Sequence, residues 1–437
     1  MTFPDAPRAS TPTGAESALS PGDSARYDER FASRASGIVS SAMRDLMSLS
    51  ERPEIISLAG GFPNTESFQR ATFDEITEIM ARDHLASSLQ YGPTEGLAEL
   101  RELIVEVMAV EGLSAHVDDV MVTSGGQQAI DLSIRTFVDP GDVVLAEGPT
   151  YPGAVPCFTT YEADVVHIPM DEDGLQVDLV EEALDRLAAE GRAPKLLYTI
   201  PNFHNPGGVT MSLERRRRLV DIAQRRELLI IEDNPYGQIR FEGEPLPSLW
   251  ELDGGSGWVV YLSTFSKILA PGVRVGWVAA PAPVLRKMNL GKQAADLCSG
   301  TVTQRFIIEY LSRYDWQDHV ARLNDIYRGR RDAMLRALDE EFPADARWTR
   351  PSGGLFVWAE LPEAVDTRDL LAQAIAREVA FAPGAAAFLN GQGRNAMRLN
   401  FSGVPEATIS EGVRRLGEAV HDAVELHRAL GLGGGSE

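Results

Sequence analysis

One lysine near the end of an apolar run is the residue best suited to chemistry. Lys267 closes the segment Ser263–Lys267, directly after the apolar run Trp258–Leu262, and Arg274 follows shortly. A lysine held against a packed sheet loses its proton more readily than a solvated one, because burial disfavours the charged form. A neutral amine can attack a carbonyl to form a Schiff base, and hydroxyls beside an arginine suit a phosphate.

An amine next to a phosphate site suggests pyridoxal phosphate, whose aldehyde and phosphate would require both. The alternative is that Lys267 is an ordinary surface lysine, so the hypothesis depends on what else converges on it. In an open α/β sheet, ligands bind beyond the carboxyl ends of the strands. Five successive predicted strands are followed by polar or glycine-rich segments, namely Ser124–Gln128, Gly148–Gly153, Pro201–Gly208, Glu232–Tyr236 and Ser263–Lys267.

Two of these segments offer groups for a phosphate and for a ring nitrogen. Gly125, Gly126 and Gln127 open a predicted helix, whose free N–H groups and dipole attract a phosphate; a simple strand–helix turn would need the same glycines. Asp233 ends an apolar strand, where an unpaired carboxylate is costly. Pairing with a protonated pyridine nitrogen would offset that cost and keep the ring an electron sink, although a turn or helix cap also explains an aspartate here.

The remaining candidates would contact the ring or the substrate. Tyr236 and Asn205 could hydrogen-bond a ring hydroxyl, although Asn-Pro is otherwise a turn signal. Tyr151 could stack on the ring, but a lone tyrosine often belongs to the core. Arg398 stands in an apolar strand pattern, where it either faces solvent or presents a buried guanidinium fork to an α-carboxylate.

The elements that position these residues alternate between short strands and amphipathic helices, as between Glu95 and Val110. Near-continuous apolar strands that alternate with helices predict an α/β fold with a mostly parallel, seven-stranded sheet covered by helices. The predicted strands are Asp119–Thr123, Val143–Glu147, Val165–Pro169, Lys195–Ile200, Leu228–Glu232, Trp258–Leu262 and Val273–Ala279.

The pattern changes after about Pro281 and predicts a smaller α+β domain. Helical stretches cover Leu285–Phe342, Thr367–Arg377 and Pro405–Leu430, and the segments Gly354–Glu360 and Met397–Phe401 resemble strands. We predict a disordered tail (1–26), an N-terminal segment that packs with the small domain (27–65), a large cofactor-binding domain (66–320), the small domain (321–430) and a flexible tail (431–437). Residues 30–60 are expected to lack sheet character.

Composition narrows the class of protein. The 437 residues include 44% hydrophobic and 24% charged residues, typical of a globular protein, and the net charge is -23. Such an acidic chain argues against nucleic acid as a partner. Two distant cysteines argue against a disulfide framework or a cysteine-based metal site and fit a reducing cytoplasm. No apolar stretch is long enough to span a membrane.

In order and spacing, Asn205-Pro206-Gly207-Gly208, Asp233 with Tyr236, Ser-x-Lys at Lys267 and the late Arg398 resemble the fold type I, class I and II aminotransferases. The resemblance is greatest to the branch that contains the 2-aminoadipate and kynurenine enzymes. It covers roughly residues 30 to 428 and includes four further motifs, Ser57–Pro63, Leu89–Gly96, Arg350–Trp358 and Phe381–Gly384.

The resemblance implies a role for each residue. Lys267 would form the Schiff base with pyridoxal phosphate and transfer the proton. Tyr91 would reach the phosphate from the partner subunit, which implies a homodimer with shared active sites. The phosphate would be held by Gly126, Gln127, Thr264, Ser266 and Arg274. The ring would be held by Asp233, Asn205, Tyr236 and Tyr151. The substrate would be bound by Arg398, Gly61, Ser41 and Arg44. No metal is implied.

Two positions depart from the family pattern, in which serine is usual at Gly126 and at Thr264. The loss at Gly126 removes one hydroxyl and keeps the backbone N–H. The implied reaction moves an amino group from an L-amino acid to a 2-oxo acid, with 2-oxoglutarate as the expected acceptor. Other reactions of the same cofactor (β-lyase, decarboxylase or synthase) and a ligand-sensing regulator domain are the alternatives.

Overall fold

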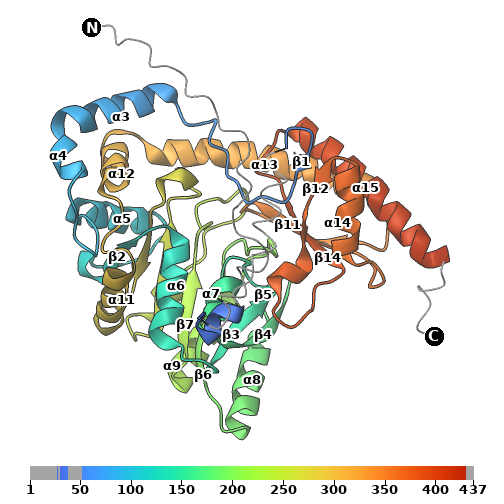
Figure 1. Cartoon of the computed structure of the whole chain (residues 1–437), viewed down its shortest axis with the longest axis horizontal. Helices are drawn as coiled ribbons and strands as arrows, with labels where there is room; N and C mark the ends of the chain where they lie inside the picture. Colours follow the sequence, from blue (N-terminus) through green and yellow to red (C-terminus); the bar gives the residue numbers. More distant parts are fainter. Residues whose placement is uncertain (1–26, 28–29, 38–51, 430–437) are drawn as a thin grey trace. The chain divides into compact units, whose positions relative to one another are not determined.

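The computed structural model describes Tyr27, residues 30–37 and residues 52–429. The chain divides into two units, residues 1–39 and 40–437. In the described part of the first unit, residues Ser33–Gly37 form the 3-10 helix η1. All other helices and strands of the described residues belong to the second unit (Figure 1).

The central sheet of the second unit has the strand order β2-β9-β8-β7-β6-β3-β4-β5. Strands β8, β7, β6, β3 and β4 pair in parallel, whereas β9 is antiparallel to β8 and β2, and β5 to β4. The strands are β2 (Val120–Thr123), β3 (Val143–Gly148), β4 (Asp164–Asp171), β5 (Gly174–Leu175), β6 (Pro194–Thr199), β7 (Leu229–Asp233), β8 (Val259–Thr264) and β9 (Gly276–Ala279).

All seven predicted strands are present, which confirms the mostly parallel sheet, and the two-residue β5 is an addition. The last strand starts later than predicted, at Gly276 instead of Val273. Residues Pro271–Val273 form the 3-10 turn η3, and Arg274 has a left-handed backbone with φ of 50°. A residue in that conformation cannot continue an extended strand, so the strand begins after it.

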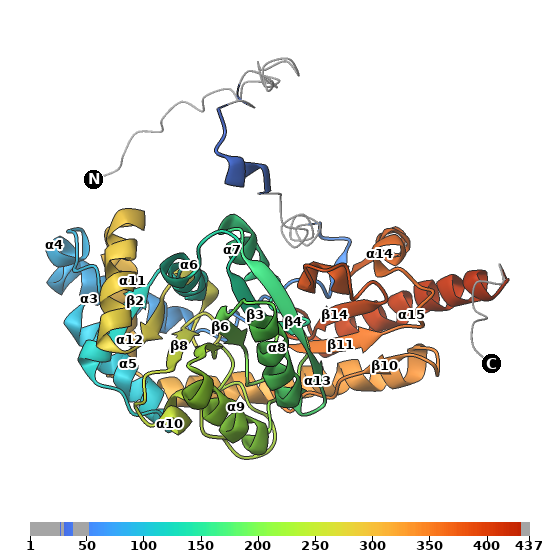
Figure 2. The ribbon, with the colours of Figure 1, turned by 90° about the horizontal axis from the view of Figure 1, so that it is seen from below.

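Helices cover both faces of this sheet. Apolar residues of α6 (Gly126–Phe137), α7 (Val155–Thr160) and α11 (Ala282–Ala295) pack on one face, and those of α8 (Val177–Ala189), α9 (Leu213–Arg226) and α10 (Leu249–Asp253) on the other. Successive side chains of strand β6 point to opposite faces of the sheet. Leu196 and Tyr198 pack in the core with α6 and α7, and Leu197 packs in the core with α8 and α9. Figure 2 shows α6 and α7 opposite α8 and α9 across the strands.

Four more helices and one 3-10 helix belong to the side of the sheet that ends at β2. The helix α5 packs on β2 and α12, and α12 packs on α3 and α4. Apolar residues of α3, α5 and α12 share one core with β2 and the C-terminal elements. The bounds are α3 (Arg70–Asp83), α4 (Leu85–Ser88), α5 (Ala98–Val110), η2 (Val117–Asp119) and α12 (Thr301–Arg313).

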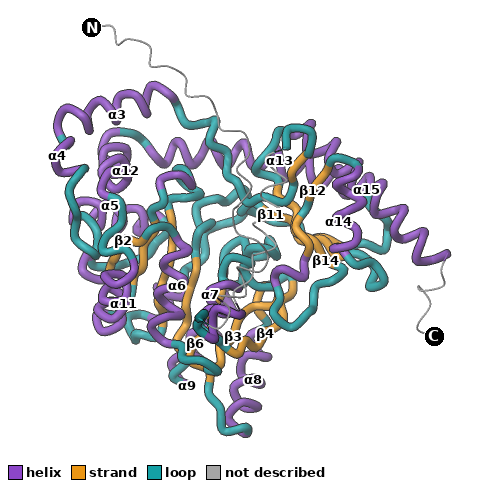
Figure 3. Tube along the Cα trace, in the orientation of Figure 1, coloured by secondary structure: helices purple, strands orange, loops and turns teal. Residues whose placement is uncertain are grey.

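The C-terminal part is an α+β arrangement, as predicted. The long helix α13 (Trp316–Glu341) packs on α15 (Glu406–Ala429), and a second sheet has the order β10-β11-β14-β13. Figure 3 shows its strands as a group apart from the central sheet. The other elements are β10 (Arg347–Trp348), β11 (Phe356–Glu360), α14 (Thr367–Ala376), β12 (Val379–Ala380), β13 (Ala382–Pro383), η4 (Gly384–Ala387) and β14 (Ala396–Asn400).

A short strand corrects one prediction. Residues 30–60 were expected to lack sheet character, but Ile56–Ser57 form β1, which pairs in parallel with β12. Two residues are too few to show a period-2 pattern, and backbone hydrogen bonds from Ile56 to Glu378 and from Leu58 to Ala380 hold the strand in place. The domain boundaries remain predictions. Among residues 27, 30–37 and 52–429, no helix combines the length and apolarity that a bilayer crossing requires.

Candidate functional site

Most of the predicted site residues line one cavity. It has a volume of about 670 Å³ and opens where β6, β7 and β8 end, with walls that also come from the segment before α3 and from the C-terminal sheet. The predicted residues that line it are Gly61, Gly126, Gln127, Tyr151, Asn205, Asp233, Tyr236, Thr264, Ser266, Lys267, Arg274 and Arg398.

The amine of Lys267 lies inside this cavity. Its Nζ donates a hydrogen bond of 3.0 Å to the carbonyl oxygen of Gly61. Burial, with the nearby positive charges of Arg398 and Arg274, lowers the pKa of Lys267 to about 8. A measurable fraction of the amine is therefore neutral near pH 7.5, so it can act as a nucleophile, unlike a solvated surface lysine.

Asp233 is a buried carboxylate at the end of β7. Asp233 is 5% exposed, and the hydroxyl of Tyr198 donates a hydrogen bond of 2.6 Å to Oδ2 of Asp233. Burial raises the pKa of Asp233 to about 7, the Tyr198 hydrogen bond opposes the increase, and the charge of Glu147 adds to it. A positive partner in the cavity would stabilise the ionised form of this carboxylate.

Asn205, Tyr236 and Arg398 form a hydrogen-bonded group in the wall of the cavity. Asn205 Nδ2 donates to the hydroxyl of Tyr236 at 3.3 Å, and Arg398 Nη1 donates to Asn205 Oδ1 at 3.0 Å. Arg398 Nη2 donates to the carbonyl of Ala59 at 2.7 Å, and the guanidinium lies 4.3 Å from the ring centroid of Phe356. Arg398 is 4% exposed, which excludes the solvent-facing alternative.

The start of α6 and two neighbouring segments form a place for an anion. The N–H groups of the first turn of a helix have no partner within it, and Gly125, with φ of 77°, precedes that turn. Gly125 has φ of 77° and ψ of 173°, a conformation that essentially only glycine adopts, and a Cβ there would also lie 2.5 Å from Nη2 of Arg274. The hydroxyls of Thr264 and Ser266, 2.9 Å apart, complete the group.

Four predicted residues do not line the cavity or fall outside the described residues. Gly125 lies just before α6, beside Arg274. Tyr91 does not line the cavity, and it is 79% exposed. Ser41 and Arg44 fall in residues 38–51, outside the residues that the structure describes. The side chain of Gln127 donates to the carbonyl of Gly153 at 2.6 Å, so its backbone N–H is the group left for an anion.

Two residues were missed by the sequence analysis. Phe356 lines the cavity beneath Arg398, and the signal for it was its place in the glycine-flanked motif Arg350–Trp358. Tyr198 lies behind Asp233, and the only available signal was its position near the end of a neighbouring predicted strand.

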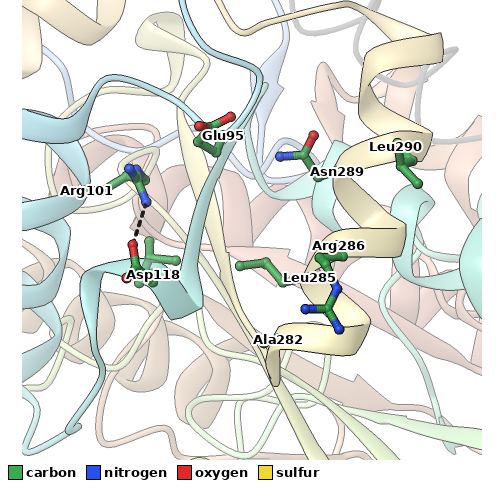
Figure 4. A pocket seen from close by; sticks show the side chains of 9 residues that line it. Glu95, Arg101, Asp118, Ala282, Leu285, Arg286, Asn289 and Leu290 are labelled. Carbon is green, nitrogen blue, oxygen red and sulfur yellow. Dashed lines mark ion pairs between the residues drawn. The ribbon is translucent and has the colours of Figure 1, made fainter.

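A second cavity contains none of the predicted site residues. It has a volume of about 450 Å³ and lies between α5, β2 and α11. Figure 4 shows the ion pair between Arg101 and Asp118 on one wall, at 3.9 Å, and Arg286 and Asn289 of α11 on the other. Because it has no buried amine or carboxylate arrangement like that of Lys267 and Asp233, we assign the chemistry to the first cavity.

The groups of the first cavity fit pyridoxal phosphate. The aldehyde suits the amine of Lys267, the pyridine nitrogen suits the buried carboxylate of Asp233, and the phosphate suits the start of α6 with Arg274. The arrangement can therefore hold the cofactor and place a buried guanidinium, Arg398, beside it.

Comparison with known proteins gives the same result. Residues 53–416 match the family model for aminotransferase class I and II. The chain is 44% identical to aromatic-amino-acid aminotransferase 1 of Thermococcus litoralis over 402 residues (91% of this chain, 96% of the relative). It is 38% identical to 2-aminoadipate transaminase of Thermus thermophilus, also over 402 residues (92% and 98%).

A solved structure of a relative resembles this chain in both fold and sequence. The kynurenine aminotransferase of Pyrococcus horikoshii, in complex with PMP, superposes with a TM-score of 0.87 at 40% identity and covers 92% of this chain and 98% of its own. The family model, the relatives and the geometry of the cavity agree. The chain belongs to the class I and II aminotransferases, and it is a pyridoxal phosphate-dependent transaminase of fold type I that acts on amino acid and oxo acid substrates.

Proposed function

We propose that Lys267 binds the cofactor aldehyde covalently and moves the proton of the substrate α-carbon. When bound, pyridoxal phosphate supplies a carbonyl that carries the amino group and a ring that accepts electrons. The lowered pKa of Lys267 supports both roles, because the neutral amine attacks a carbonyl and also accepts a proton. The amine donates a hydrogen bond to the carbonyl of Gly61, which also lines the cavity.

The surrounding residues would hold the rest of the cofactor. Asp233 would keep a proton on the pyridine nitrogen, Asn205 and Tyr236 would bind the ring hydroxyl, and Tyr151 would pack on the ring. The phosphate would take backbone N–H groups of Gly125, Gly126 and Gln127, the hydroxyls of Thr264 and Ser266, and the guanidinium of Arg274.

Arg398 would bind the α-carboxylate of either substrate, with Asn205 and Gly61 beside it. A guanidinium fork binds a carboxylate through two parallel hydrogen bonds, and burial strengthens the interaction. Ser41 and Arg44 stay candidates for contact with the substrate side chain.

The enzyme would work as a homodimer in which Tyr91 reaches the phosphate of the second copy. Support comes from the apolar surface around Tyr91, since Leu85, Leu89 and Val302 are 56%, 72% and 45% exposed. Thr301 donates to the carbonyls of Ser88 and Gln90, so these segments form one continuous surface. Apolar patches of this kind mark protein–protein contacts.

We place the enzyme in the cytoplasm, where both of its cysteines, Cys157 and Cys298, would stay reduced. For substrates we propose an L-amino acid donor and 2-oxoglutarate as acceptor. The names of the relatives favour aromatic donors, kynurenine and 2-aminoadipate, and Phe62, Pro63 and Phe356 in the cavity wall favour apolar donor side chains.

The observation that carries this proposal is that Lys267, Asp233 and Arg398 line one cavity. The test is a set of half-reactions in which the purified holoenzyme meets single amino acids while the absorption of the cofactor is followed. Aromatic amino acids, kynurenine and 2-aminoadipate should bleach the visible band, and 2-oxoglutarate should restore it. Lys267→Ala should lack the band, whereas the exposed control Lys287→Ala should keep it; an intact band and turnover in Lys267→Ala would defeat the assignment.

A further inference from the structure

The carboxylate of Asp233 is held from behind by a second buried side chain. Tyr198 is fully buried, and its hydroxyl donates to Asp233 Oδ2 at 2.6 Å. Tyr198 lies on β6 opposite Ile231 of the parallel neighbour β7. Side chains two residues apart on a strand share a face, so Asp233 is on the same face as Ile231, and the hydroxyl of Tyr198 reaches it diagonally.

The ring of Tyr198 is fixed by packing. It meets the ring of Phe158, in α7, edge to face, with centroids 5.8 Å apart and an interplanar angle of 76°. Both rings belong to the apolar layer between the sheet and α6 and α7. The tyrosine therefore has little rotational freedom, and its hydroxyl is a preorganised donor.

The two oxygens of Asp233 have different surroundings. Oδ2 accepts the Tyr198 hydrogen bond, while Oδ1 has no hydrogen-bond partner among residues 52–429. Asp233 lines the cavity, but Tyr198 does not. Tyr198 therefore contacts the carboxylate of Asp233 from the side away from the cavity, and Oδ1 of Asp233 is left for a group inside the cavity.

We propose that Tyr198 is a positioning residue for catalysis: it orients Asp233 and keeps it ionised toward the cofactor ring. This inference rests on the proposed role of Asp233 at the pyridine nitrogen. A hydroxyl donor stabilises the charged form of a carboxylate. Burial raises the pKa of Asp233 and the charge of Glu147 on β3 adds to the increase, so a donor that favours the ionised form opposes both effects. The other titratable groups that line the cavity with Asp233 are Tyr151, Tyr236, Lys267, Arg274 and Arg398. Behind it, His204 Nε2 lies 3.0 Å from Glu147 Oε2.

The test replaces Tyr198 by phenylalanine, which keeps the ring and removes the donor. We expect kcat to fall about 10- to 100-fold, as for the loss of one hydrogen bond to a charged group, with KM changed by less than about twofold. A second readout is the pH titration of the visible band of the holoenzyme. Without the Tyr198 hydrogen bond, the cofactor ring should carry less positive charge. The Schiff-base nitrogen that joins Lys267 to the cofactor should then hold its proton to higher pH, so the midpoint of the titration should rise by about one pH unit or less.

Tyr261→Phe is the matched control. Tyr261 is also fully buried in the sheet, but its hydroxyl accepts from Asn234 and does not line the cavity. If Tyr198→Phe matches the wild type in kcat and midpoint, or if Tyr261→Phe changes both equally, the inference is wrong. If the wild type itself has no visible band and no amino transfer, the proposed function fails instead.

A further variant covers the case in which Tyr198→Phe does not fold. Phe158→Leu removes the edge contact that orients the Tyr198 ring and leaves the hydroxyl in place. It should shift the midpoint in the same direction by a smaller amount, and an unchanged midpoint would count against the role of Tyr198.

Discussion

Arg398 and Asn205 are joined by a hydrogen bond of 3.0 Å between Nη1 and Oδ1. Arg398 lies on β14 of the C-terminal sheet, and Asn205 follows β6 of the central sheet. The same asparagine donates to Tyr236 through Nδ2. The proposed substrate-binding guanidinium and the proposed ring-binding residues therefore form one connected unit, in which a change at Arg398 reaches the cofactor side through a single side chain.

Replacement of Arg398 by lysine should raise KM for both the amino acid and the oxo acid by about 10- to 100-fold, because one ammonium cannot replace a planar fork that also holds Asn205. Steady-state kinetics with each substrate varied in turn measure the effect. Arg394→Lys, in an exposed ion pair with Asp366, is the control and should match the wild type. Equal KM values in Arg398→Lys would remove Arg398 from the carboxylate site.

Two neighbouring glycines should respond in opposite ways to serine. A Cβ on Gly126 would meet Thr264 at no less than 3.8 Å, so Gly126→Ser adds a hydroxyl beside the phosphate without a clash. It should lower the cofactor dissociation constant about tenfold. Gly125→Ser forces a side chain at φ of 77° against Arg274 and should cost about 1 kcal/mol or more of stability. Equilibrium dialysis of the cofactor measures the first effect, and urea unfolding measures the second. Weaker cofactor binding in Gly126→Ser would contradict the proposed phosphate site.

The buried carboxylate of Asp233 should make the cofactor-free protein sensitive to pH. Its pKa is about 7 in the folded chain and 3.8 in the reference state, so the folded state binds more protons between these values. The free energy of unfolding must then fall as pH rises from about 4 to 7, by about 4 kcal/mol at most from this group. Asp233→Asn should be more stable than the wild type at pH 8 and show little difference at pH 4.

Urea unfolding of the cofactor-free proteins at the two pH values measures this difference. The holoproteins are the control. A protonated ring nitrogen stabilises the carboxylate, so the bound cofactor should remove the deficit of the wild type relative to Asp233→Asn at pH 8. A difference that does not depend on pH would show that Asp233 is not the titrating group.

Shared active sites predict complementation between two inactive variants. Tyr91→Ala and Lys267→Ala damage different residues, which in a dimer contribute to the same site from different copies. Mixed dimers regain one intact site, so random mixing should restore about a quarter of wild-type activity. Co-expression with two affinity tags isolates the mixed dimer. Activity no higher than that of either parent would exclude a contribution of Tyr91 from a second copy.

Much of the fold was readable because apolar strands that end in glycine or polar residues are local signals. The strand before Lys267 and the helix after Gly125 appear where their patterns predicted them. The two-residue strands β1, β5, β10, β12 and β13 were not predicted, since they are held by backbone hydrogen bonds and are too short to show a side-chain period. The order of the strands in the sheet depends on long-range pairing, which a local pattern does not contain.

The site also has residues that the local sequence predicts and residues that only tertiary packing places. Lys267 and Asp233 could be named in advance because each is a charged residue at the end of an apolar run, where a charge needs a reason. The direction of the Gln127 side chain, toward the carbonyl of Gly153, and the hydroxyl of Tyr198 behind Asp233 depend on tertiary packing. Tyrosine is common in strands, so nothing in its own neighbourhood distinguishes Tyr198 from a core residue.

The pairing of β1 with β12 has a consequence for biosynthesis. Leu58 and Ala59 lie just before Gly61, whose carbonyl accepts a hydrogen bond from Lys267. They are held by Ala380 and by Arg398, which follows Ala59 by 339 residues in the chain. A nascent chain that still lacks β12 and β14 has no partner for this segment. The cofactor site can therefore be complete only after these two strands have been synthesised and have met the segment before Gly61.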